Sequence, residues 1–162
     1  MSATDEIKQA ASARALDVLT RILETSGLDA KVEIVQPEDA ADVALAITGP
    51  EAGLLVGHRG QVLDSLQYLV TLMVSIKLAG ERVRIGLDSD GYRAKRRDTL
   101  TKFANKLADE VVSNGEEGVT EPLNPLERRI IHTALADRGD VSTYSEGEEP
   151  NRYIVVAPKS AD

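Results

Sequence analysis

Hydrophobic residues recur at helical spacing at the start of the chain and alternate with polar ones soon afterwards. Residues 5–24 carry one apolar stripe that ends at Ser26 and Gly27, which predicts a first helix. Residues 31–35 and 42–47 alternate between apolar and polar side chains on either side of a turn-rich segment that contains Pro37. We expect these two segments to pair as antiparallel strands.

The next part of the chain returns to helical spacing before a further strand. Residues 51–56 predict a short helix that stops at a glycine-flanked tetrapeptide, residues 57–60, and residues 62–76 predict a long amphipathic helix. Residues 83–87 then alternate as a strand. The predicted element order of the first half is therefore α-β-β-α-α-β.

Turn-forming residues occupy positions 88–91, between this strand and a charged helix that starts at Tyr92. We place a domain boundary there and predict two small domains, residues 1–88 and 89–162. The predicted order of the second domain is α-β-α-β-β, so the fold class is α+β. Its expected elements are a helix over 92–112, a short strand, an extended connector over 122–125, a helix over 126–136, and strands over 141–144 and 152–156. The residues expected on the buried face of the first of these helices are Leu100, Phe103, Leu107 and Val111.

Charge is distributed unevenly along the chain. The formal net charge is −8, and it divides into −6 over residues 1–56, +5 over residues 57–108 and −7 over residues 109–162. Because a polyanion is repelled by a negative body, any nucleic-acid binding should be confined to the basic middle of the chain. Aromatic residues make up 3% of the chain and Trp is absent, so surfaces for stacking bases are scarce.

Few residues suit catalysis. The chain has no Cys and two His, and it has no Gly-Lys-[Ser/Thr] phosphate loop, so we expect no enzyme, no cofactor and no small-molecule substrate. The enzymatic alternative is a Ser-His hydrolase, which requires the fold to bring Ser142, Thr143 or Ser145 beside His132. The start of the chain lacks an apolar leader and the longest apolar runs are broken by charge, which predicts a cytoplasmic protein without membrane insertion.

The tetrapeptide Gly57, His58, Arg59 and Gly60 is the first candidate binding element. Glycine at both ends allows the backbone to adopt positive φ and to pass close to a ligand, and a helix N-terminus directly after it can direct amide N–H groups at a phosphate. Arg59 would add a charge-assisted contact. The alternative is that Gly57 merely ends one helix and Gly60 starts the next.

Arg128 and His132 form the second candidate. They lie four residues apart in the predicted helix 126–136, so they share one face. The alternative is a solvated helix face on which Arg128 pairs with an acidic neighbour such as Glu127 or Glu121.

Both candidates lie in segments that resemble one known family. Residues 53–60, GLLVGHRG, with residues 63–69, LDSLQYL, are similar to the KH domain of the Jag family, also called KhpB or SpoIIIJ-associated. The predicted element order matches the type II form of KH. Residues 124–132, NPLERRIIH, with residues 143–152, TYSEGEEPNR, resemble the R-three-H domain that follows KH in that family. The resemblance covers nearly the whole chain, from about residue 11 to residue 159.

The resemblance implies non-catalytic binding of single-stranded RNA. In KH domains the loop clamps the backbone of about four nucleotides beside an apolar groove. The implied clamp is Gly57, His58, Arg59 and Gly60, and the implied groove wall is Leu55, Val56 and either Val43 or Leu45. In the second domain the implied phosphate or base contacts are Arg128 and His132, with supporting charges from Arg129, Arg152, Arg93 and Arg96.

The resemblance also implies partners and a cellular role. Family members pair with a second, single-KH-domain protein and act as post-transcriptional regulators or RNA chaperones that affect cell elongation or division. Many of them carry an additional N-terminal domain, and docking to membrane-associated partners through that domain is not carried over to this chain. The alternative from another functional class is a protein-interaction module that keeps the KH shape, has weak or no RNA affinity, and binds a basic partner through its acidic flanks.

Overall fold

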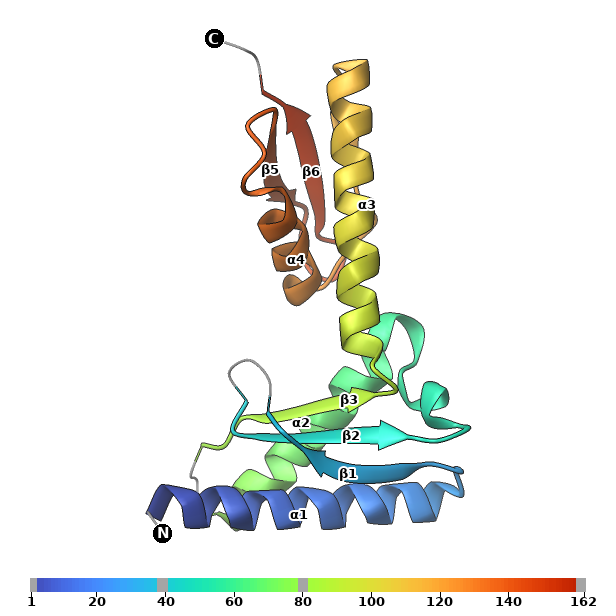
Figure 1. Ribbon diagram of the computed structural model, residues 1–162, viewed down its shortest axis with the longest axis vertical. Helices are drawn as coiled ribbons and strands as arrows, with labels where there is room; N and C mark the ends of the chain where they lie inside the picture. The colour runs from blue at the N-terminus through green and yellow to red at the C-terminus, as the bar shows by residue number, and fades with distance from the viewer. Residues whose placement is uncertain (1–2, 38–40, 79–81, 160–162) are drawn as a thin grey trace. The chain divides into compact units, whose positions relative to one another are not determined.

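The chain folds into two compact units, Met1–Arg93 and Ala94–Asp162. The computed structural model describes residues 3–37, 41–78 and 82–159. Within these ranges each unit has its own three-stranded sheet with helices packed on it (Figure 1). The predicted α+β class is confirmed.

The first unit is built on a sheet with the strand order β1-β2-β3. Strand β1 runs antiparallel to β2, with Ile34 opposite Leu45, as the alternating pattern predicted. Strand β2 runs parallel to β3, with Leu45 opposite Leu87, so β3 is an edge strand. The elements of the unit are α1 (Ala3–Ser26), β1 (Lys31–Val35), β2 (Val43–Thr48), the short 3-10 helices η1 (Ala52–Leu55) and η2 (His58–Gly60), α2 (Gln61–Lys77) and β3 (Ile85–Ser89).

The core of the first unit lies between one face of this sheet and helices α1 and α2. Alternate residues of β2, among them Leu45 and Ile47, are at most 2% exposed, because the side chains of a strand alternate between its two faces. Leu19 of α1 and Leu63 of α2 are fully buried in the same cluster. Burying each such side chain contributes about 1.5–3 kcal/mol.

Two boundaries in the first unit differ from the prediction. Strand β3 begins at Ile85 and continues through Ser89, whereas the sequence predicted a strand over 83–87 and a turn over 88–91. The turn residues at 88 and 89 become part of the strand because parallel pairing with β2 places Ser89 opposite Ile47. The Ser89 hydroxyl is fully buried and donates to the Ala52 carbonyl at 2.8 Å. The predicted short helix over 51–56 is the single 3-10 turn η1.

The second unit has the predicted element order, α-β-α-β-β. Its sheet has the strand order β4-β6-β5, and both strand pairs are antiparallel. The elements are α3 (Tyr92–Asn114), whose first two residues belong to the first unit, β4 (Gly118–Val119), α4 (Pro125–Leu135), β5 (Val141–Glu146) and β6 (Tyr153–Pro158).

The buried face of α3 is rotated from the predicted one. Leu100 and Val111 are buried as expected, but Phe103 is 42% exposed and Leu107 is only partly buried. The remaining core positions of the helix are Ala104 and Ala108, both fully buried. Alanine lets neighbouring elements approach the helix closely, so the packed stripe follows small residues rather than the largest apolar ones.

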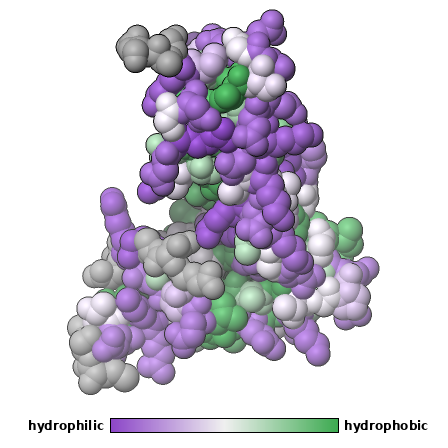
Figure 2. Space-filling view, turned by 45° about the horizontal axis from the view of Figure 1, so that its top comes forward, coloured by the Kyte–Doolittle hydropathy of each residue, from purple (hydrophilic) through white to green (hydrophobic). Residues whose placement is uncertain are grey.

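Apolar side chains also reach the surface of the first unit, where Figure 2 shows hydrophobic residues in green. Several of them lie on α2: Val62, Leu69 and Ile76 recur every seven residues, so they share one face of the helix, and they are 41%, 48% and 70% exposed. Nevertheless, no helix in the described ranges is both long enough and apolar enough to cross a membrane.

Candidate nucleic-acid interface

The tetrapeptide of residues 57–60 forms a tight reversal between η1 and α2. Gly57, Arg59 and Gly60 have φ angles of 68°, 52° and 80°, in the left-handed region. A Cβ on Gly57 would lie 2.9 Å from the Cβ of Val62, and a Cβ on Gly60 would lie 2.8 Å from the Cε1 of Tyr92. The loop therefore needs glycine at both ends, both for its backbone angles and for its packing.

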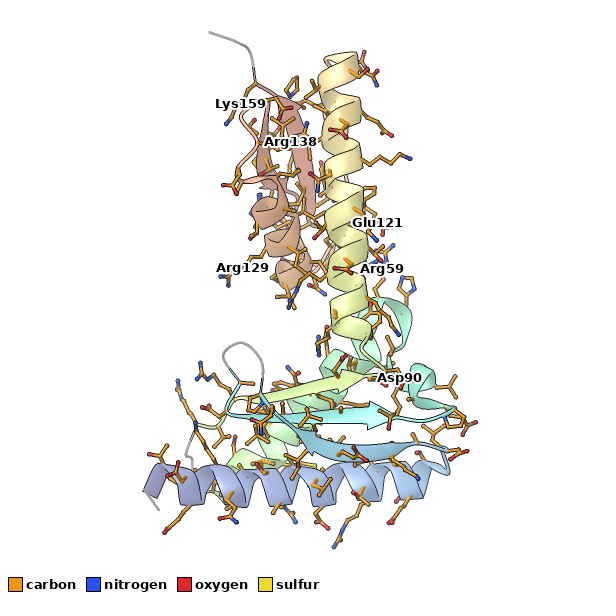
Figure 3. All side chains as sticks on the ribbon, in the orientation of Figure 1. Arg59, Asp90, Glu121, Arg129, Arg138 and Lys159 are labelled. Atoms are coloured by element: carbon orange, nitrogen blue, oxygen red, sulfur yellow. The ribbon has the colours of Figure 1, made fainter. Side chains whose placement is uncertain are left out.

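The first amides of α2 are already used inside the protein. The backbone N–H groups of Val62 and Leu63 donate to the carbonyl of Val56, at 3.1 and 3.3 Å. The expectation that these helix-start amides point at a ligand is therefore wrong for both groups. What the loop presents outward is side chains. His58 is exposed. Arg59, labelled in Figure 3, is half-buried.

The predicted wall of the apolar groove is only partly accessible. Val43 and Leu45 are 2% and 1% exposed, because they point into the core from the inner face of β2. Neither can contact a ligand. Leu55 is also buried, whereas its neighbour Leu54, which was not predicted from the sequence, is 64% exposed beside the loop.

Arg93 closes the open edge of β3. Its Nε donates to the Leu87 carbonyl at 2.7 Å, while the Leu87 N–H donates to the Oε1 of Gln67 at 2.9 Å. The Nη2 of Arg93 also lies 3.0 Å from the Oδ1 of Asp64. Both backbone polar groups of Leu87 on the edge strand are thus satisfied by side chains, which protects the edge from pairing with another chain. Arg93 was predicted from the sequence as a supporting charge, whereas Gln67 and Asp64 were not predicted.

In the second unit, Arg128 is held inside the protein rather than on a solvated face. It is 8% exposed; its Nη1 donates to the Leu123 carbonyl at 2.6 Å, and its Nη2 lies 2.5 Å from the Oε1 of Glu149. Arg128 therefore pairs with Glu149, and not with Glu127 as expected for a solvated helix face. Glu127 does not pair with Arg128 because it forms a capping box: its side chain accepts from the backbone N–H of Asn124 at the start of α4.

His132 faces strand β5. Its Nδ1 lies 2.8 Å from the Oγ1 of Thr143 and its Nε2 lies 3.3 Å from the Oγ of Ser145. Thr143 and Ser145 point the same way because they are two residues apart in a strand. Burial and, secondarily, the positive charge of Arg128 lower the pKa of His132 below its ordinary value of 6.5. The fold therefore does bring His132 together with a serine, as the hydrolase alternative required, and burial disfavours the protonated imidazole.

The other predicted arginines differ in their surroundings. Arg96 pairs with Glu127 at 2.8 Å, and its Nη2 is buried without a hydrogen bond. The Nε of Arg152 is buried without a hydrogen bond as well. Arg129 is exposed and projects outward from α4 (Figure 3). Two of the three supporting arginines in this unit thus retain an unused buried donor.

Within the described ranges, no group of three or more His, Asp or Glu residues could hold a metal ion. The loop and the second unit instead carry side chains with hydrogen-bond donors and positive charge, which suit an anionic ligand.

Comparison with known proteins accounts for both units. The model of the KhpA/KhpB KH domain matches residues 14–87, and the model of the R-three-H domain matches residues 98–158. Together they define a KH domain followed by an R-three-H domain, the arrangement that the two motifs indicated.

Curated relatives match most of the chain. The RNA-binding protein KhpB of Clostridium symbiosum is 36% identical over 152 residues, which are 94% of this chain and 68% of that protein. The protein of the same name from Bacillus subtilis is 37% identical over 131 residues, 80% of this chain and 62% of that protein. The one from Lactiplantibacillus plantarum is 33% identical over 141 residues, 87% of this chain and 43% of that protein. The chain belongs to the KhpB family and spans between about two fifths and two thirds of these relatives' lengths.

We expect Gly60→Ala to lower the free energy of unfolding by about 1–3 kcal/mol, because alanine at a positive φ is strained and its Cβ would meet Tyr92. The matched control is Gly53→Ala in the neighbouring η1, where no atom lies within 4 Å of the added Cβ. Urea unfolding followed by circular dichroism measures both variants. Equal stability of the two would contradict the strained geometry of the loop.

We expect the lowered pKa of His132 to make the protein less stable as the pH falls. The unfolded chain takes up a proton on His132 near pH 6.5, before the folded protein does, so the free energy of unfolding should decrease as the pH drops through and below that value. Unfolding curves across the range of about pH 5 to 8 test this. His132→Gln should flatten the dependence, while the control His58→Gln, at an exposed position of the loop, should keep it.

Proposed function

We propose that this protein binds single-stranded RNA without catalysis, through the loop of residues 57–60 and the Arg128 region of the second unit. The observation that carries the proposal is the loop itself, in which glycine at both ends holds a strained reversal that presents His58 and Arg59. The relatives that match most of the chain are named RNA-binding proteins. In KH domains such a loop holds the sugar-phosphate backbone of a single strand.

Recognition in this proposal divides between the two units, Met1–Arg93 and Ala94–Asp162. The first holds the strand at Gly57, His58, Arg59 and Gly60. The second adds Arg128 and His132, supported by Arg129, Arg152 and Arg96. Arg93 contributes mainly by securing the edge of β3, since its guanidinium already has three partners within the first unit.

Binding should depend strongly on salt. The chain carries a net charge of −8, so attraction to RNA relies on local positive groups, whose effect on a phosphate backbone is screened beyond about 8–10 Å at physiological ionic strength. A cytoplasmic regulator or chaperone of RNA, affecting cell elongation or division, is the cellular role we propose.

The contact between His132 and Ser145 does not favour hydrolysis. A histidine that activates serine is normally oriented by a carboxylate on its other nitrogen, but the Nδ1 of His132 faces the hydroxyl of Thr143. The separation of 3.3 Å between Nε2 and the serine oxygen is also longer than the usual distance of about 2.6–3.2 Å between a nucleophile and its base. Thr143 and Ser145 act, in this proposal, as polar neighbours that hold the imidazole.

The decisive experiment changes the charge of the loop and preserves its shape. In His58→Asp/Arg59→Asp the outward side chains become negative, and we expect the affinity for a short labelled single-stranded RNA to fall at least about tenfold at low salt. The control is His58→Asn/Arg59→Asn, because asparagine tolerates the left-handed angles of position 59 as well as aspartate does and carries no charge. Fluorescence anisotropy at two salt concentrations measures the affinity.

Three outcomes of this titration separate the alternatives. A larger loss in the aspartate variant than in the asparagine variant, with unchanged circular dichroism, supports the loop as the clamp. Equal affinity of the wild type and the aspartate variant contradicts the clamp. A wild type that binds no RNA even at low salt makes protein interaction the leading function.

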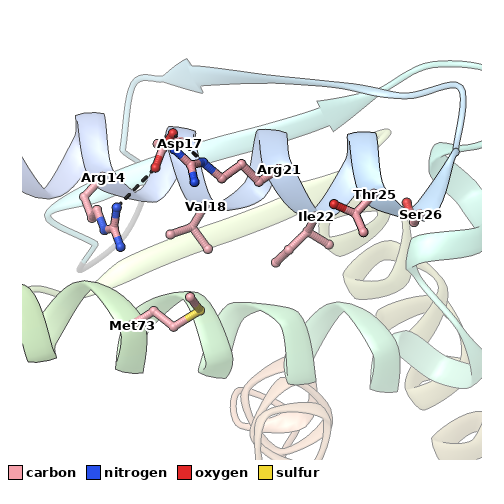
Figure 4. Close-up of a pocket in the computed structure, with 8 residues that line it drawn as sticks. All are labelled: Arg14, Asp17, Val18, Arg21, Ile22, Thr25, Ser26 and Met73. Atoms are coloured by element: carbon pink, nitrogen blue, oxygen red, sulfur yellow. Dashed lines mark hydrogen bonds and ion pairs between the residues drawn. The ribbon is translucent and has the colours of Figure 1, made fainter.

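A specific surface favours protein interaction as a second function. The exposed apolar face of α2, with Val62, Leu69 and Ile76, adjoins a groove between α1 and α2 whose apolar lining is Val18, Ile22 and Met73 (Figure 4). An ion pair between Arg14 and Asp17 lies along its rim. We propose a single-KH-domain protein as the occupant, since the matching model covers both KhpA and KhpB. An apolar patch with a polar rim is typical of a protein–protein interface.

We expect Leu69→Ser/Ile76→Ser to weaken the complex with a purified single-KH protein of the KhpA type at least about tenfold, since apolar anchors dominate such interfaces. The control is Val112→Ser, which removes a valine that is 45% exposed in the second unit. Sedimentation velocity of the mixtures measures the complex. No complex with the wild type, or equal loss in both variants, would contradict the proposed surface.

A further inference from the structure

The cation that defines the second site is already neutralised by the protein itself. Arg128 is about one-tenth exposed at its side chain, and its Nη2 lies 2.5 Å from the carboxylate of Glu149. One N–H of the Nη1 group donates to the Leu123 carbonyl, so the Nη2 group that faces Glu149 is the donor we assign to an RNA phosphate oxygen. Glu149 therefore occupies the position that the phosphate needs.

The two partners of Arg128 differ in how readily they can leave. Leu123 is 3% exposed and its backbone N–H donates to the carbonyl of Arg152 at 3.0 Å, so its carbonyl is fixed in place. Glu149 lies between β5 and β6, outside both strands, and its side chain is 53% exposed. A half-exposed ion pair contributes little net stability, because water competes for both charges. The carboxylate can swing into solvent while the guanidinium stays where it is.

Arg152, whose positive charge acts on Glu149, has a buried donor that lacks an acceptor. The Nε of Arg152 is buried and makes no hydrogen bond, although a buried unsatisfied donor is normally unfavourable. The positive charge of Arg152, after the hydrogen bond and charge of Arg128, helps to keep the pKa of Glu149 below its ordinary value. Arg128 and Arg152 thus act on one anionic position. A phosphate has more acceptor oxygens than a carboxylate and can satisfy more donors.

We propose that Glu149 is a built-in competitor for RNA, a carboxylate that occupies the phosphate position at Arg128 until a nucleic-acid phosphate displaces it. This inference rests on the proposed RNA binding of the second unit. Its consequence is that weak or nonspecific anions are excluded from Arg128, and only a strand already held elsewhere on the protein gains the contact.

The test neutralises Glu149 and compares it with its neighbour. Glu149→Gln removes the competing charge and frees Arg128, so the affinity for single-stranded RNA at low salt should increase about fivefold, the scale of one exposed ion pair. Glu148→Gln removes the same charge one residue earlier, from an exposed position. In the described part of the chain, the carboxylate that pairs with Arg128 is that of Glu149. We expect Glu148→Gln to change the affinity less than about twofold, the effect of one distant screened charge.

A third variant identifies the cation through which Glu149 acts. Arg128→Met/Glu149→Gln replaces the ion pair by uncharged side chains of similar length, which a buried site tolerates better than one unpaired charge. The gain of Glu149→Gln should disappear in this variant while circular dichroism stays unchanged. A gain that persists without Arg128, or equal gains in Glu149→Gln and Glu148→Gln, would overturn the competitor role. If the wild type and all variants bind no RNA, the proposed function itself fails.

Discussion

The parallel pairing of β2 with β3 is the constraint on which the first unit depends. Parallel neighbours cannot be joined by a tight turn, so the chain must cross over the sheet between them. The crossover consists of η1, the loop of residues 57–60 and α2, and its sharp reversal is possible because Gly57 and Gly60 accept positive φ. The same pairing places β3 at the sheet edge, where Gln67 and Arg93 satisfy the backbone of Leu87.

Folding reduces the positive charge that is available to attract RNA. The stretch of residues 57–108 carries +5, yet three of its arginines are matched by carboxylates within the same unit. Matched arginines attract a polyanion less than free ones, so electrostatic recognition depends on the few cations that stay accessible, such as Arg129, or that can exchange partners, such as Arg128. The ion pairs that match the arginines of this stretch are Arg84 with Asp42, Arg93 with Asp64, and Arg96 with Glu127.

Local patterns predicted most elements and failed where long-range contacts compete. The start of α3 at Tyr92 and the end of α1 beside Gly27 followed from turn and capping residues. The turn expected at Ser89 instead became strand, because β2 offered it backbone partners and Ala52 offered a buried acceptor. Phe103 was expected in the core and is exposed, because α3 packs through alanines.

The sequence alone determined the order of elements, the two motifs and the family, since these depend on residue types at short spacings. The tertiary structure decided which groups are available for binding. Spacing placed Arg128 and His132 on one face, but only the fold could pair Arg128 with Glu149 and His132 with Thr143, residues 21 and 11 positions away. Such pairs depend on how strands and helices pack, which short-range patterns do not encode.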